Sequence, residues 1–249
     1  MNNIFKNCYY INLDRSKERK DFIEKTYKNV KRIKAVDYID IQNNSVLDNN
    51  NIIYNKCTIL NKIGKIKHIS YPEIAVTLSH LKAILTAKLN NLEEVIIFED
   101  DVRCDYIDKW DKTVYDIIKI MPEDCECLQL FCSNQKVINK FKNCKNNFVK
   151  WTYNNWGATA YYINKKGIDK IYKKFNIFKY NIILDNTNIP IVADILIFDS
   201  LNTYTYTKPL FNHKPGNSTI HINNINQKLG HDKLHIDGEN EIKKYFQDK

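Results

Sequence analysis

Three consecutive carboxylates, Glu99, Asp100 and Asp101, are the sharpest chemical feature of the sequence. Because like charges repel, their pKa values rise unless a cation balances them. In an extended segment residues two apart point the same way, so we expect Glu99 and Asp101 to converge while Asp100 faces elsewhere. Oxygen ligands of this kind suit Mg²⁺ or Mn²⁺, and such an ion can bridge a diphosphate. The alternative is an acidic turn that caps the following helix, and the pattern alone favours neither.

The element that must position these acids is a strand. Residues 95–98 (VIIF) are continuous, apolar and mostly β-branched, which is typical of a buried central strand. In open α/β sheets ligands bind in the crevice beyond the carboxyl ends of such strands. Residues 8–13 predict a second strand, followed by a helix that begins at 14–16 and ends near Lys28. This opening indicates an α/β fold.

The remaining pattern alternates between helices and strands in the same way. Helices are predicted at 72–90, 106–120 and 164–175 and from about residue 240, where a frayed polar tail is the alternative. Strands are predicted at 127–131, 158–163 and 203–207, the last as an edge strand. A long loop with small elements is predicted at 40–70, and a loop at 211–225. No repeat or linker requires a domain boundary, so we expect residues 1–249 to form a single domain.

Composition excludes several classes of protein. The chain has 249 residues, enough to bury a substantial core, and its 12% aromatic content argues against disorder. No apolar run reaches the roughly 18–20 residues that span a bilayer. The first residues lack the apolar segment and cleavage site of a secretory signal. We therefore expect a cytoplasmic protein, in a bacterium or a virus-infected cell, for which peripheral membrane contact and the oligomeric state stay open.

Charge and cysteines point away from two further classes. The 38 Lys+Arg against 29 Asp+Glu give a net charge of +9, which permits contact with anions. The lysines are scattered, however, and no helix-turn-helix, RRM or KH signature is present, so nucleic-acid binding is not expected. The seven cysteines show no disulfide spacing, and the lone C-x-C at 125–127 does not predict a zinc site.

A set of short segments runs in a fixed order through nearly the whole chain. The segments are 10–19 (YINLDRSKER), 35–37 (AVD), 73–80 (EIAVTLSH), 98–103 (FEDDVR), 156–167 (WGATAYYINKKG), Asp194 and 218–220 (STI). This ordered set resembles glycosyltransferase family 25, which contains lipooligosaccharide galactosyltransferases and the collagen-modifying galactosyltransferases. The sequence departs from the family at three positions, where Pro72, Ala75 and Val76 replace the usual Gly, Gly and Cys. The resemblance therefore does not predict the conformation of the turn at these residues.

The resemblance implies a GT-A-type fold, with a Rossmann-like mixed sheet flanked by helices. It also implies a metal-dependent, inverting glycosyltransferase. The enzyme would move a hexose, galactose or glucose, from a UDP-sugar to a hydroxyl of a glycan, a lipooligosaccharide or a hydroxylated protein. Mn²⁺ or Mg²⁺ would be its cofactor. The first alternative is a GT-A-fold structural subunit that has lost catalysis, and the less favoured one is a basic nucleic-acid-binding protein.

The same resemblance implies a set of residues that bind the donor. They are Asn12, Asp14, Arg15, Arg19, Asp37, Glu73, Ser79, His80, Asp100 and Trp156. For several of them a structural role is the alternative: Arg19 pairs with a neighbouring acid, Asp37 caps a helix, and His80 is a core residue of an amphipathic helix. Trp156, with Trp151 and Tyr153, either stacks on a sugar face or packs into the core.

Metal ligands and a catalytic base complete the implied site. Glu99 and Asp101 would hold the metal. His213 would be the third ligand, with His221 as its competitor and an exposed loop histidine as the alternative. An inverting transfer needs a carboxylate that takes the proton of the acceptor hydroxyl. Asp194 is the first candidate for this base and Asp185 the second, and for Asp194 the alternative is a helix N-cap.

Overall fold

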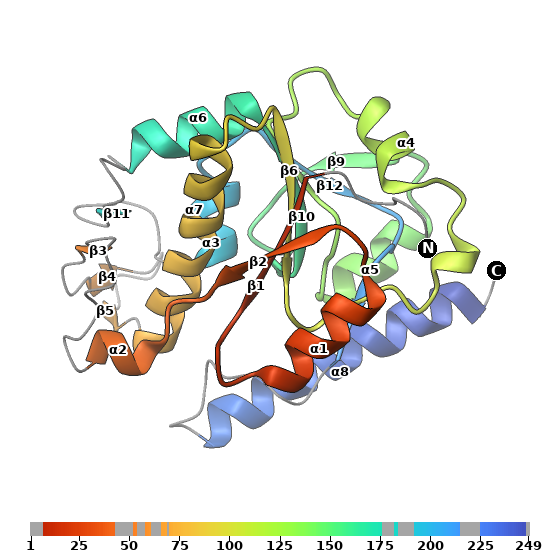
Figure 1. Ribbon diagram of the computed structural model, residues 1–249. Coiled ribbons are helices and arrows are strands. Elements are labelled where there is room, and N and C mark those ends of the chain that lie inside the picture. Colours follow the sequence, from red (N-terminus) through yellow and green to blue (C-terminus); the bar gives the residue numbers. More distant parts are fainter. Residues whose placement is uncertain are drawn as a thin grey trace.

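The computed structural model describes residues 7–42, 52–53, 58–60, 66–68, 70–175, 182–183, 192–214 and 225–247 (Figure 1). Its centre is a seven-stranded sheet in the order β2-β1-β6-β10-β8-β12-β9. The strands are β1 (Cys8–Asn12), β2 (Val30–Lys34), β6 (Glu94–Glu99), β8 (Cys127–Gln129), β9 (Phe148–Lys150), β10 (Ala160–Asn164) and β12 (Thr203–Tyr206). Short strands outside this sheet are β3 (Ile52–Ile53), β4 (Thr58–Leu60), β5 (Ile66–His68), β7 (Val102–Arg103), β11 (Ile182–Ile183) and β13 (Asn212–His213).

The sheet is mixed. β1 runs parallel to both β2 and β6, whereas β10 is antiparallel to β6 and to β8. β12 runs parallel to β8 and antiparallel to β9. This arrangement confirms the α/β class and the Rossmann-like mixed sheet that the sequence predicts.

Helices cover both faces of the sheet. They are α1 (Lys17–Thr26), α2 (Tyr38–Gln42), α3 (Tyr71–Leu89), α4 (Val114–Lys119), α5 (Gln135–Lys142), α6 (Lys165–Lys174), α7 (Ala193–Phe198) and α8 (Ile225–Gln247), with one 3₁₀ turn at Ile107–Lys109. Helices α3, α6 and α7 lie on one side of the sheet, and α1, α5 and α8 on the other (Figure 1). Among the helices of the described segments, none combines the length and the apolar character that a membrane span needs.

The core consists of two clusters separated by the sheet. Because successive strand residues point to opposite faces, Val95 and Ile97 of β6 pack beneath α3, while Ile96 and Phe98 pack toward α1 and α8. The four are at most 1% exposed, which confirms the predicted buried strand. β6 therefore delivers the acids that follow it to a rigid edge of the sheet.

Helix α3 begins where its sequence predicts. The Ser70 hydroxyl accepts a hydrogen bond from the Glu73 backbone N–H, and the Glu73 carboxylate accepts from the Ser70 backbone N–H at 2.8 Å. This capping box, with Pro72 in the first turn, starts the helix. Glu73, predicted to bind the donor, is thus a capping residue that also lines the cavity described below.

Two predicted elements differ from the structure in extent. The helix predicted at 106–120 is a 3₁₀ turn at Ile107–Lys109 followed by α4, because Thr113 and Asp116 form a second capping box that starts α4 there. The C-terminal helix, predicted from about residue 240 with a frayed tail as the alternative, begins earlier, at Ile225, and ends at Gln247.

Two predictions about strands are wrong. The segment predicted as an edge strand, β12, lies inside the sheet because the short strand β9 pairs with its free side. Within the predicted loop at 211–225, Asn212 and His213 form β13, which pairs antiparallel with β7. That pairing brings His213 next to the segment that follows the acidic triplet.

Candidate active site

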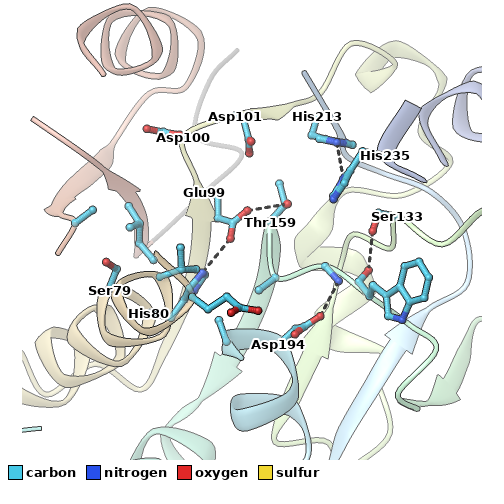
Figure 2. Close-up of a pocket in the computed structure, with 18 of the residues that line it drawn as sticks. Ser79, His80, Glu99, Asp100, Asp101, Ser133, Thr159, Asp194, His213 and His235 are labelled. Atoms are coloured by element: carbon cyan, nitrogen blue, oxygen red, sulfur yellow. Dashed lines mark hydrogen bonds and ion pairs between the residues drawn. The ribbon is translucent and has the colours of Figure 1, made fainter. Parts of the chain in front are cut away.

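A cavity of about 510 Å³ opens beyond the carboxyl ends of β1 and β6 (Figure 2). The predicted site residues among those that line it are Asn12, Arg19, Glu73, Ser79, His80, Glu99, Asp100, Asp101, Trp156, Asp194 and His213. Three described residues that were predicted to bind the donor, Asp14, Arg15 and Asp37, do not line it. Asp185 and His221 lie outside the described residues.

Glu99 is held by two side chains at the end of β6. Its Oε1 lies 3.1 Å from His80 Nε2, and its Oε2 accepts from the Thr159 hydroxyl at 3.0 Å (Figure 2). His80 Nδ1 lies 3.1 Å from the Tyr161 hydroxyl, so both ring nitrogens of this fully buried histidine have partners. Burial acts to raise the pKa of Glu99. The hydrogen bond from His80 and the charge of His80 act the other way, and the net effect is a lowered pKa. Glu99 is therefore a fixed carboxylate.

Asp100 faces the other way, into a buried network. Its Oδ2 accepts from Asn12 Nδ2 at 2.7 Å and its Oδ1 from Arg19 Nη1 at 2.7 Å. The side-chain oxygen of Asn12, Oδ1, in turn accepts from Arg32 Nε at 2.9 Å. The network ties β1 and α1 to the turn that follows β6 and gives Asn12 and Asp100 a positioning role. Arg19 makes the ion pair that was the alternative to phosphate binding.

Asp101 is incompletely satisfied. Its Oδ2 lies 3.6 Å from Arg19 Nη1, whereas its Oδ1 is buried and has no hydrogen-bond partner in the part of the chain that the structure describes. Burial, and after it the charge of Glu99, raises the pKa of Asp101 to about 7. A buried polar atom without a partner demands an explanation, and a bound cation is one. The chemistry of this unpartnered carboxylate oxygen, with the Glu99 carboxylate lining the same cavity, therefore suits a divalent ion.

His213, the predicted third metal ligand, does not direct its ring nitrogens to Glu99 or Asp101. His213 Nδ1 lies 2.7 Å from Glu239 Oε1, and His213 Nε2 lies 2.8 Å from His235 Nδ1. Both nitrogens of His213 thus contact side chains of α8, although the ring lines the same cavity as Glu99 and Asp101. Within the described residues, no group of three or more His, Cys, Asp or Glu side chains is arranged to hold a metal ion.

Asp194 enters the cavity from the start of α7. Its Oδ2 accepts from the Gly157 backbone N–H at 3.1 Å (Figure 2) and its Oδ1 from that of Ile195 at 2.9 Å. Val192 is the N-cap of α7, so the predicted alternative of an N-cap role for Asp194 is wrong. Burial raises the pKa of Asp194, against the effect of the two N–H groups. A carboxylate of raised pKa is suited to take a proton.

Gly157 can offer its N–H only because it is a glycine. Its φ is +112°, and a Cβ at this position would lie 3.0 Å from the Phe131 ring. The preceding residue, Trp156, is 37% exposed and lines the cavity, and its contact with a sugar stays a prediction.

Four of the predicted donor residues make protein contacts that stabilise loops. Arg15 pairs with Asp37, and Asp14 pairs with Arg32 at 2.7 Å and with Lys34 at 3.0 Å. The Ser79 hydroxyl accepts from the Val36 backbone N–H at 2.8 Å and donates to the Ala75 carbonyl oxygen at 2.7 Å. That these residues also contact a donor stays a prediction.

Sequence reasoning did not single out Thr159, Tyr161 or His235. Thr159 and Tyr161 stand two apart in the 156–167 segment, and this spacing is the signal that both face His80 and Glu99. No signal predicted His235, because it lies on the part of α8 that the sequence does not predict as helix. Its helix packs so tightly that a Cβ on Gly238 would lie 2.1 Å from the Ser133 carbonyl oxygen.

Comparisons with known proteins show which family the sequence matches. The model of glycosyltransferase family 25, described as an LPS biosynthesis protein, matches residues 5–187. Among solved structures, the chain is similar to that of a glycosyltransferase involved in the glycosylation of the major capsid of PBCV-1. The identity is 11% and the TM-score 0.30, over 81% of this chain and 93% of that one. The comparison with curated proteins finds no match.

Proposed function

Because the chain belongs to glycosyltransferase family 25 and is therefore a glycosyltransferase, we propose that it is a metal-dependent, inverting hexosyltransferase. Its donor is a UDP-sugar, UDP-galactose or UDP-glucose, and its acceptor a hydroxyl of a glycan, a lipid-linked sugar or a protein. The observation that carries this proposal is the buried Oδ1 of Asp101, which lacks a partner among the described residues and lies beside a second carboxylate.

Asp101 and Glu99 would hold the cation. Carboxylate oxygens are the ligands that Mg²⁺ and Mn²⁺ prefer, and both fit here. When bound, such an ion neutralises the negative charge that develops on a diphosphate leaving group. His80 and Thr159 hold Glu99 in one orientation, and such outer contacts are what orients a ligand for its metal.

Asp194 acts as the base. In an inverting transfer the acceptor oxygen forms a bond to the anomeric carbon as the bond from that carbon to the diphosphate oxygen breaks. The electron pair of the broken bond leaves with UDP, and the proton of the acceptor hydroxyl passes to the Asp194 carboxylate. The backbone N–H groups of Gly157 and Ile195 keep this carboxylate in place, while burial makes it a stronger base.

Release of UDP tests the proposal. The wild-type protein is incubated with UDP-galactose and with UDP-glucose, with and without Mn²⁺, and UDP is measured over time. We expect Mn²⁺ to stimulate the release of UDP from one of the two donors, and Asp101→Asn to remove the stimulation. A folded wild-type protein that binds neither donor and releases no UDP would instead fit the structural-subunit alternative.

A further inference from the structure

The indole of Trp156 is a large apolar ring that lines the cavity and is partly exposed to solvent. It is 37% exposed, and of the described residues that line the cavity only Leu234, at 48%, is a comparably exposed large apolar one. Large apolar side chains that stay exposed in a pocket with polar groups mark binding sites.

The surrounding loop holds this ring rigidly. The indole Nε1 donates to the Tyr153 carbonyl oxygen at 3.0 Å, and the Trp156 carbonyl oxygen accepts from the Ser133 backbone N–H at 3.0 Å. Gln129 Nε2, which is buried, donates to the carbonyl oxygens of Asn155 and Gly157, each at 2.9 Å. A ring fixed in this way loses little conformational entropy when a ligand stacks on it.

The position of Trp156 indicates which of the two substrates, the sugar donor or the acceptor, it would contact. It is the neighbour of Gly157, whose N–H anchors Asp194 at 3.1 Å. If Asp194 is the base, the acceptor hydroxyl lies against it, and the part of the cavity lining that anchors the base, at Gly157, is next to the acceptor. The diphosphate would lie instead near Asp101, which follows a different strand. The acceptor side therefore suits Trp156 better than the donor side predicted from the sequence.

We propose that Trp156 is the stacking platform of an acceptor subsite, and that the acceptor is a saccharide whose pyranose ring lies on the indole. This inference rests on the proposed function. A pyranose presents C–H groups on its face, which match the electron-rich face of an indole, and hydroxyls around its edge. The cavity offers those hydroxyls the polar side chains of Ser133, Lys214 and Asp232.

Binding of simple disaccharides tests the subsite without catalysis. Saturation-transfer NMR is recorded with lactose and with cellobiose on the wild-type protein, in the presence of UDP and Mn²⁺, and affinities are taken from titrations. We expect Trp156→Ala to weaken binding of the preferred disaccharide at least tenfold and Trp156→Phe to restore most of it. Ile120→Ala, which removes a 48% exposed residue outside the cavity, should leave binding unchanged.

Kinetics then separate the subsite from the proposed function. With the preferred donor, Trp156→Ala should raise KM for the disaccharide more than it raises KM for the donor. If the wild-type protein turns over no UDP-sugar, the proposed function fails while the NMR titration still decides whether Trp156 binds a saccharide. The subsite is overturned if neither disaccharide binds, if Trp156→Ala binds as the wild type does, if Trp156→Phe behaves as Trp156→Ala, or if a hydroxylysine peptide is the better acceptor.

Discussion

The two sides of the cavity are built by different means. The acidic side consists of Asn12, Arg19, His80, Glu99, Asp100 and Asp101, which come from β1, α1, α3 and the end of β6. The base side consists of Trp156, Gly157, Asp194, His213 and His235, which come from a loop, α7, β13 and α8. Figure 2 shows Glu99, Asp100 and Asp101 following one strand, whereas Asp194, His213 and His235 come from separate segments.

The two sides also differ in how their carboxylates are satisfied. Both oxygens of Asp100 and of Glu99 have side-chain partners, and both oxygens of Asp194 have backbone partners. Asp101 is the exception, because its buried Oδ1 has none in the described residues. On one side, therefore, backbone N–H groups hold the carboxylate that we propose as the base, and on the other one carboxylate oxygen receives no hydrogen bond from the described residues.

The largest effect should come from Asp101→Asn. We expect the rate of sugar transfer to fall at least about a thousandfold, because a group that balances charge in the transition state is worth several kcal/mol. The free energy of unfolding should change little, since Oδ1 has no described partner to lose and Oδ2 lies at the long distance of 3.6 Å from Arg19 Nη1. Transfer assays and urea unfolding measure the two quantities.

Asp100→Asn is the matched control for that variant. The new amide group would face the donor groups of Asn12 or Arg19, both now 2.7 Å from the carboxylate, and leave one of them without an acceptor. We expect unfolding free energy to fall by about 1–3 kcal/mol. Equal stability losses in the two variants would contradict the distinction between the two acids.

Asp194→Asn should come next, with a loss of about 10²- to 10⁴-fold in kcat, the usual contribution of a general base. The base acts only when deprotonated, and burial raises the pKa of Asp194, so the wild-type rate should rise with pH through that raised pKa. The variant should lose this rising limb while its KM for the donor changes little. A variant with normal kcat and a raised donor KM would reassign Asp194 to donor binding.

A smaller effect on activity is expected from a substitution where α8 packs against Ser133. In Gly238→Ala the new methyl group would collide with the Ser133 carbonyl oxygen, so we expect a loss of about 1–3 kcal/mol in unfolding free energy. Because His235 and Glu239 lie on the same helix, kcat should fall as well. Asn240→Ala, at an exposed position of α8, is the control and should keep both quantities.

The smallest effect is expected for Thr159→Val. The substitution removes the hydrogen bond to Glu99 Oε2 and leaves the one to His80. One such bond contributes about 1 kcal/mol, so we expect the affinity for Mn²⁺ to fall several-fold, as measured by calorimetry in the presence of UDP. An unchanged affinity would mean that Glu99 does not contact the ion.

The same comparison explains how far the sequence predicts the site. The acidic side was predictable because β6 is continuous and apolar and its acids follow at once, and because α3 carries its own cap. The base side depends on contacts between distant segments. Helix α8 contains Gly238, which disfavours a helix, and it leaves Leu229, Leu234 and Ile236 exposed, so no clear apolar stripe marks it as a helix in the sequence. Its place depends on packing against Ser133, which no local pattern encodes.

The order of the matching segments along the chain also does not predict which of their residues line the cavity. Arg15 and Asp37 belong to segments that match the family, yet the structure pairs them with each other away from the cavity lining. The alternation at 203–207 predicts a strand, but the place of that strand inside the sheet follows from its pairing with the three residues of β9. Such partner choices are decided by tertiary packing rather than by local sequence.

The central claim is that Asp101 and Glu99 seat a divalent ion that contacts the diphosphate of a UDP-sugar. Anomalous X-ray scattering from crystals grown with Mn²⁺ and UDP tests it most directly. We predict a manganese peak within coordination distance of Asp101 Oδ1 and of a UDP phosphate oxygen. Clear density for UDP without manganese at Asp101, or for manganese only at another site, would contradict the account.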